Sequence, residues 1–201
     1  MNKLLYIANL RLPTEKAHGV QIMKSCEAFS QFAEVELVVP RLTSFLKKEP
    51  FSYYGIKNFF SIKKVPVLEA LTLSKWVGNW VVYIQNISFS ISAVLYILLK
   101  GKRKDPHTVL YSRDYITLFI LAILGAHPVS EIHDYRTKNS KWGINFALKK
   151  CSMIMVNSEG TLMALRRHYP DNLNLKTAKV VPNGVDPQYF DIKETKEVAR
   201  Q

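Results

Sequence analysis

The chain has little cysteine, little glycine and few acidic residues. Two cysteines and eight glycines occur among 201 residues, and Cys26 and Cys151 are far apart, with no CxxC pair and no histidine at metal-ligand spacing. Neither a disulfide scaffold nor a zinc site is therefore expected, and a reducing cytoplasm is the default prediction. The glycines are also too sparse for GxGxxG or GxxxxGK[ST], which excludes the common dinucleotide-binding and P-loop classes.

Motifs for hydrolysis and simple metal chemistry are missing as well. No GxSxG, HExxH or DxD occurs, so hydrolase and metal-dependent hypotheses have no support and no metal ligands are predicted. The 28 Lys and Arg exceed the 16 Asp and Glu, which gives a net charge of +12. No RNA- or DNA-binding motif accompanies this charge, so nucleic acid ranks below an anionic membrane surface or a phosphorylated acceptor as the partner.

Short apolar runs alternate with segments of helical periodicity, and 48% hydrophobic residues suffice for one domain core. In the first βαβ unit, Ile22, Cys26, Phe29 and Ala33 mark the helix face. Regular alternation predicts an α/β fold with a Rossmann-like, doubly wound parallel sheet over residues 1–190, and a linker over 191–201. Strands are expected at 3–8, 35–39, 61–65, 108–111, 129–133, 152–156 and 178–181. Helices are expected at 115–124, from Asn139 or Ser140 to 150, and from a Ser158 cap to 168.

One uncharged segment, residues 76–99, is long enough to cross a bilayer. Polar residues recur along it, which favours a helix or helix pair packed in a soluble core. A membrane-contacting segment is the alternative, because Lys75 and the cluster Lys100, Lys102, Arg103 and Lys104 would suit anionic headgroups.

Ligands of open parallel sheets bind beyond the carboxyl ends of the strands. His18 and Gly19 enter a helix there, either as an anion-binding loop or as an ordinary βα loop. Glu131 and His133 share one face at a strand end. His133 is either a hydrogen-bond donor and acid or base in a cleft, or a histidine satisfied by the adjacent carboxylate. Asn183-Gly184 alone is merely a tight turn.

Four segments in order resemble the N-terminal half of family-4 glycosyltransferases of the GT-B fold. Residues 17–29 are similar to that family's opening loop and first helix, and Glu131-Ile132-His133-Asp134 to its E-x-H-D segment. Residues 156–159 resemble a later strand-to-helix junction, and residues 180–186 the segment that closes the first domain. One departure is that many relatives have two adjacent glycines where this chain has His18-Gly19.

The resemblance implies a hexosyltransferase of polysaccharide or glycolipid assembly that works with retention and needs neither metal nor cofactor. A nucleotide-sugar is its co-substrate, and a glycan or glycolipid its acceptor. His133 would face the sugar as the catalytic residue, and the Gly19 amide would lie near the donor phosphates. The resemblance also implies substrate-binding roles for His18, Arg113, Asp134, Ser158, Asn183 and Gly184.

The family's second domain carries a Glu-x7-Glu pair, and no two glutamates here are eight positions apart. The chain is therefore predicted to be the acceptor-side half, inactive without a donor-binding domain. The alternative is a stand-alone module that binds a glycan or a lipid-linked glycan without catalysis. Either would be cytoplasmic, with peripheral attachment to the inner face of the membrane as an open alternative.

Overall fold

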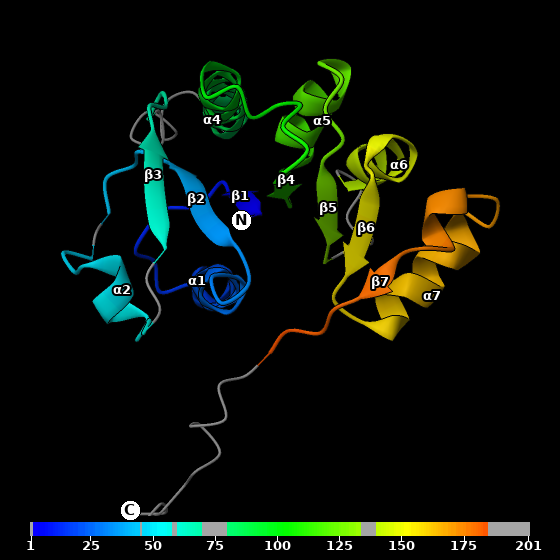
Figure 1. Ribbon diagram of the computed structural model, residues 1–201, viewed down its shortest axis with the longest axis horizontal. Coiled ribbons are helices and arrows are strands. Elements are labelled where there is room, and N and C mark those ends of the chain that lie inside the picture. Colours follow the sequence, from blue (N-terminus) through cyan, green and yellow to red (C-terminus); the bar gives the residue numbers. More distant parts are fainter. Residues whose placement is uncertain (1, 45, 58–59, 70–79, 134–139, 185–201) are drawn as a thin grey trace, which may run out of the picture.

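A parallel β-sheet forms the middle layer of the computed structural model, which describes residues 2–44, 46–57, 60–69, 80–133 and 140–184 (Figure 1). Within these residues the sheet has seven strands in the order β3-β2-β1-β4-β5-β6-β7, and every neighbouring pair is parallel. This order extends the doubly wound arrangement that the sequence predicts. The strands are β1 (Lys3–Ile7), β2 (Glu34–Pro40), β3 (Ser61–Val65), β4 (Thr108–Ser112), β5 (Val129–Ile132), β6 (Met153–Val156) and β7 (Lys179–Val180).

Helices cover both faces of the sheet. α1 (Ala17–Phe29) and α2 (Pro50–Tyr53) lie on one face, and α4 (Trp80–Leu99), α5 (Tyr115–Ile123) and α6 (Ser140–Lys150) lie on the other (Figure 1). α7 (Glu159–His168) and a 3-10 turn (Leu173–Leu175) share a core cluster with α6 at the β6 edge. The Rossmann-like, doubly wound α/β fold is thus confirmed.

Alternating side chains of the central strand supply both halves of the core, because successive residues of a strand point to opposite faces. Tyr6 packs into the cluster beneath α1, together with Leu37 of β2. Leu5 and Ile7 pack beneath α4, against Phe89 and its neighbours. The centre of the sheet is therefore buried on both sides.

The predicted elements are confirmed to within a few residues, with three differences. α1 ends at Phe29, so Ala33 lies beyond the helix. The segment predicted as one helix or a pair contains α4 from Trp80, and residues 76–79 lie outside the described residues. The four-residue α2 has no counterpart in the prediction; it begins at Pro50 and is capped by Glu49, whose carboxylate accepts from the Ser52 amide. The predicted linker, 191–201, also lies outside the described residues.

α4 is both a core helix and an apolar surface helix. It is long and apolar enough to cross a bilayer on length and composition alone: its most apolar 18-residue stretch has a mean hydropathy of 1.7, and 39% of that stretch is buried inside the protein. Phe89, Ala93 and Ile97 on its inner face are fully buried against the sheet. The outer face is exposed to solvent.

Candidate functional site

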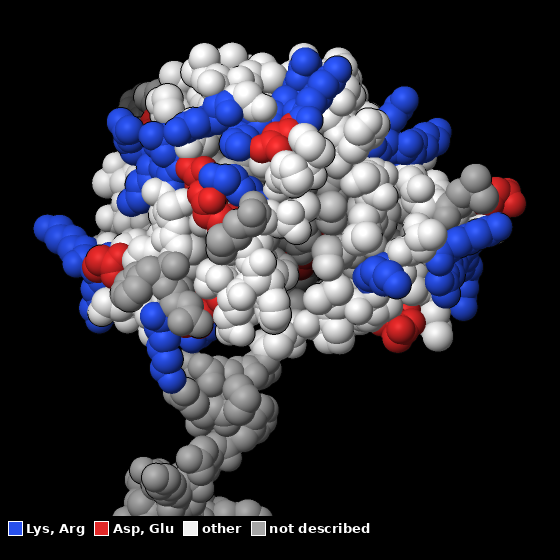
Figure 2. Space-filling model, in the orientation of Figure 1, with Lys and Arg blue, Asp and Glu red and all other residues white. Residues whose placement is uncertain are grey.

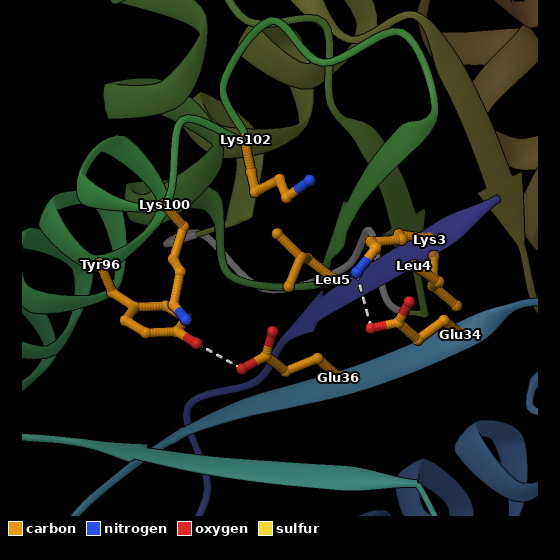
Figure 3. Close-up of a pocket in the computed structure, with 8 residues that line it drawn as sticks. All are labelled: Lys3, Leu4, Leu5, Glu34, Glu36, Tyr96, Lys100 and Lys102. Carbon is orange, nitrogen blue, oxygen red and sulfur yellow. Dashed lines mark hydrogen bonds and ion pairs between the residues drawn. The ribbon is translucent and has the colours of Figure 1, made fainter. Parts of the chain in front are cut away.

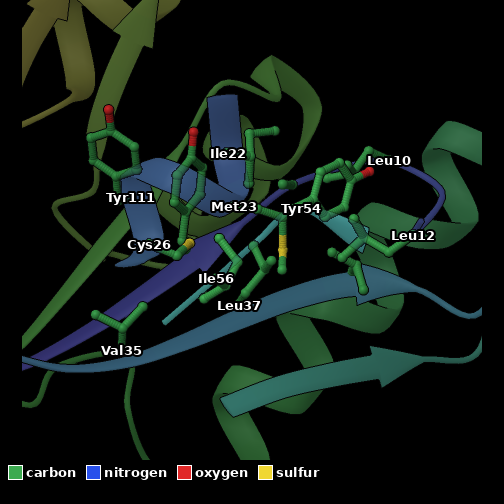
Figure 4. Close-up of a cluster of buried hydrophobic side chains, with 13 residues drawn as sticks. Leu10, Leu12, Ile22, Met23, Cys26, Val35, Leu37, Tyr54, Ile56 and Tyr111 are labelled. Atoms are coloured by element: carbon green, nitrogen blue, oxygen red, sulfur yellow. The ribbon is translucent and has the colours of Figure 1, made fainter. Parts of the chain in front are cut away.

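A cluster of polar side chains lies near the carboxyl ends of β1, β4 and β5, on the α1 face of the sheet. Tyr6 of β1 is paired in register with Tyr111 of β4, and the two rings pack edge to face at 4.7 Å. Tyr111 belongs to the apolar cluster around Cys26, and its hydroxyl points out of that cluster (Figure 4). Both hydroxyls converge on Glu131 of β5.

Glu131 is the centre of this group, which we call the Glu131 cluster: Tyr6, Tyr111, Arg113, Glu131 and His133. Arg113 donates to both carboxylate oxygens, from Nε at 2.9 Å and from Nη2 at 2.8 Å. The Tyr6 hydroxyl donates at 3.2 Å, Tyr111 donates as well, and Nε2 of His133 is in hydrogen-bond contact with Oε1. Such bidentate, charge-assisted bonds are among the stronger ones in proteins.

The electrostatics of the cluster follow from an ionised Glu131. Burial alone would raise its pKa, but the bond with His133 and the Arg113 guanidinium outweigh burial and hold the pKa at about 2. Burial raises the pKa of both tyrosines, and the negative charge of Glu131 raises it further. Both tyrosines therefore stay neutral donors to a carboxylate.

Arg113 extends the cluster to the first helix and to the last strand. Its Nη1 donates to Oε1 of Gln21 on α1 at 3.0 Å, and Nε2 of Gln21 donates to Oδ1 of Asn183, three residues after β7. The structure thus brings together three residues that the sequence proposes for the site, namely Arg113, His133 and Asn183. They come from the exits of three different strands.

His18 and Gly19 lie in the first turn of α1. His18 is exposed as a residue, but partial desolvation of its imidazole, together with the charges of Lys16 and Arg113, lowers its pKa. The Gly19 amide donates to the Lys16 carbonyl at 2.9 Å. A Cβ at Gly19 would lie 2.6 Å from the Tyr54 hydroxyl, so close packing requires glycine here. The proposed role of its amide at the donor phosphates stays a prediction.

The other predicted site residues differ in what surrounds them. Ser158 caps α7 as predicted, since its hydroxyl accepts from the Thr161 amide at 3.1 Å. Gly184 is exposed and has open space around it. Asp134 lies outside the described residues. Substrate binding by these three residues stays a prediction.

His133 is the member of the cluster that reaches furthest toward solvent, with 25% of its side chain exposed, against 19% for Arg113 and 11% for Glu131. A carboxylate that holds one ring nitrogen orients an imidazole for hydrogen bonding or proton transfer. Among the described residues, no three histidine, cysteine or acidic side chains gather to hold a metal ion.

Three residues of the site were not predicted from the sequence: Tyr6, Tyr111 and Gln21. The strand order was needed to see that β1 and β4 are neighbours, and the rotation of α1 was needed to place Gln21. The position of Glu131 within a predicted strand was the available signal, because a carboxylate buried in a sheet requires partners.

A cavity of about 160 Å³ lies at the opposite edge of the sheet, beside the first residues of β1 and β2 (Figure 3). Most of its polar side chains already have partners: Lys3 bonds Glu34 at 2.7 Å, Tyr96 of α4 donates to Glu36, and Lys102 pairs with Asp105 at 2.7 Å. Ligand sites of open parallel sheets lie at the carboxyl edge instead. The Glu131 cluster is therefore the better candidate.

No protein-family model matches the sequence, and no curated protein matches it. Solved structures do share its fold. HepE of Anabaena in complex with UDP and glucose aligns with a TM-score of 0.62 at 10% identity, over 100% of this chain and 49% of that one. Apo UGT2 of Phytolacca americana aligns with a TM-score of 0.60 at 12% identity, over 100% and 54%. Os79 of O. sativa, in complex with UDP and deoxynivalenol-3-glucoside, aligns with a TM-score of 0.57 at 9% identity, over 98% and 56%.

These similarities identify the fold class of the chain. The chain has the Rossmann-like fold found in GT-B glycosyltransferases, and it spans about half the length of these solved structures.

Proposed function

We propose that this chain is the acceptor-side domain of a family-4 type glycosyltransferase. Together with a donor-binding domain, it transfers a hexose from a nucleotide-sugar to a glycan or glycolipid acceptor, with retention and without a metal ion. The observation that supports this proposal best is the Glu131 cluster. It joins His133 to Glu131 within the segment that resembles the family's E-x-H-D, in a fold that glycosyltransferases share.

In this proposal, each residue of the cluster has a distinct role. Glu131 fixes the His133 ring at the carboxyl edge, where the imidazole hydrogen-bonds to the sugar being transferred. Arg113 and Gln21 hold the α1 end and the Asn183 segment against this edge. The leaving nucleotide diphosphate gains negative charge during transfer, and backbone amides at the start of α1 stabilise it.

A transfer assay with a matched pair of histidine variants tests the proposal. The purified chain is combined with a donor-binding domain of the family, labelled nucleotide-sugars and membranes of the producing organism as the acceptor source. We expect His133→Ala to keep the circular dichroism spectrum of the wild type and to lower the thermal midpoint only slightly, since one bond to Glu131 is lost, but to lose transfer. His127→Ala, at an exposed position before β5, is the control and keeps transfer.

Three outcomes would contradict the proposal. Full transfer by His133→Ala would exclude a catalytic role. A large loss of stability in that variant would show that His133 is a core residue. Glycan binding with no transfer after the donor-binding domain is supplied would favour a binding module without catalysis.

A further inference from the structure

The outer face of α4 is a continuous apolar stripe. Its residues are spaced by three or four positions, so they lie on one side of the helix. Their exposed fractions run from 45% at Ile87 to 75% at Trp80. We call this stripe the α4 outer face: Trp80, Ile84, Ile87, Ile91 and Leu95.

Two neighbours enlarge the apolar surface. Leu68 is exposed, and its amide donates to the Ser88 hydroxyl of α4 at 3.1 Å, which places it beside the helix. At the start of α4, the rings of Trp80 and Tyr83 lie 6.1 Å apart and are both exposed. Aromatic side chains of this kind favour the boundary between water and lipid.

Positive charge collects at the other end of the helix. Lys63 and Lys100 each lie over the Tyr96 ring of α4, with their ammonium groups 5.3 and 5.8 Å from its centre. These two lysines and Lys104 are exposed and form no ion pair with a described residue. Lys and Arg side chains gather at the top of Figure 2, over α4 and the turn that follows it.

The acidic side chains near this end of α4 already form a hydrogen bond or an ion pair within the chain. α4 itself carries no charged residue from Trp80 to Leu99. Glu36 accepts from Tyr96, and Asp105 pairs with Lys102 at 2.7 Å. A second copy of the chain would therefore bring no free carboxylates from α4 to these lysines. An anionic lipid surface supplies both the apolar and the negatively charged partner.

A membrane-spanning position of α4 does not fit the packing. The inner face fills the core beneath the sheet with Phe89, Ala93 and Ile97. Ser90 on the same side donates to Asp114 at 2.8 Å and accepts from Thr117 at 3.0 Å. Withdrawal of α4 into a bilayer would expose that core and leave these buried polar groups without partners.

We propose that the α4 outer face docks on an anionic bilayer, with α4 in the plane of the interface. The stripe enters the boundary between headgroups and acyl chains, and Lys63, Lys100 and Lys104 contact lipid phosphates. The first half of α4 lies at the carboxyl edge of the sheet, because Asn86 accepts from Asn9 just after β1 at 2.9 Å. The docked helix thus lies level with the carboxyl edge of the sheet, while the Glu131 cluster stays on the other face, beneath α1.

Vesicle co-sedimentation tests this proposal without any transfer assay. The chain is mixed with phosphatidylcholine vesicles that contain or lack phosphatidylglycerol. We expect binding to the anionic vesicles that weakens with added salt. Ile87→Asn with Ile91→Asn removes two exposed apolar side chains and lowers the binding constant by about tenfold or more. Lys100→Gln with Lys104→Gln lowers it by about thirtyfold on anionic vesicles.

Phe32→Asn is the matched control, since this side chain is 82% exposed just beyond α1, the helix on the other face of the sheet. It should bind vesicles like the wild type, and all variants should keep the wild-type circular dichroism spectrum. The proposal is overturned if the wild type does not bind anionic vesicles, or if the isoleucine variant binds as well as the control. Dimerisation that the isoleucine variant abolishes, without vesicle binding by the wild type, would assign the face to a second copy.

Discussion

Replacement of Glu131 by glutamine removes the charge that holds the Glu131 cluster together. The carboxylate accepts two bonds from Arg113, one from each of two tyrosines, and contacts His133. Glutamine has nearly the same shape but leaves the Arg113 guanidinium, 19% exposed, without a counter-charge. Loss of one partner of a largely buried ion pair is strongly destabilising. The variant therefore tests whether the cluster stabilises the fold as well as the site.

The pKa of Glu131 sets the magnitude of the effect and its pH dependence. That pKa falls from an ordinary 4.5 to about 2 in the folded chain, which corresponds to about 3 kcal/mol of stability at pH 7. Because the folded pKa is the lower one, this stability is fully present above pH 4.5 and is lost as the pH falls toward 2. The difference between wild type and Glu131→Gln should then shrink to about 2 kcal/mol at pH 3.5.

Urea unfolding followed by circular dichroism at several pH values between 3.5 and 7 measures this difference. Glu34→Gln serves as the control, because Glu34 forms an exposed pair with Lys3 on the same sheet. Its free energy of unfolding should stay within about 1 kcal/mol of the wild type. A difference for Glu131→Gln that is independent of pH would refute the role of the charge, and no difference at all would refute the central position of Glu131.

Changes at three further positions, Gly143, Gly160 and Ser158, concern α6 and α7. Gly143→Ala should lower the free energy of unfolding by about 1–3 kcal/mol in urea melts, because the new Cβ would lie 2.6 Å from Cβ of Tyr115 and closer still to its ring. Gly160→Ala should raise the free energy of unfolding by about 0.5–1 kcal/mol, because the new Cβ would meet only the Ser158 hydroxyl, at 3.8 Å. Equal effects at the two glycines would contradict the packing argument. Ser158→Ala should cost about 1 kcal/mol through the lost helix cap, and Ser158→Asp should restore it.

Most of the fold could be predicted because its signals are local. Short apolar runs gave the strands, and the start and end of α5 were marked by residues with clear roles. Asp114 accepts from the Thr117 amide at the start, and Gly125 adopts a φ of +78° just after the end. α2 was missed because a four-residue helix shows no periodicity.

The site could be predicted only in part, because it depends on which strands are neighbours. Contact between Glu131 and His133 follows from alternation along one strand, and the structure confirms it. Tyr6 and Tyr111 are more than a hundred residues apart, and they meet because β1 and β4 pair in register. Gln21 depends on how α1 is rotated against the sheet. Alternation within one strand shows neither which strands are neighbours nor how α1 is rotated.

The two cysteines make the chain convenient for site-specific labelling. Cys26 is fully buried in the cluster beneath α1, and Cys151 is nearly so. Burial raises the pKa of both thiols, that of Cys151 to about 12, so little thiolate is present at neutral pH. A cysteine introduced at Ile91 would react with a maleimide fluorophore or spin label while the native pair stays protected. Depth of insertion and distances to the sheet could then be measured on an otherwise unaltered chain.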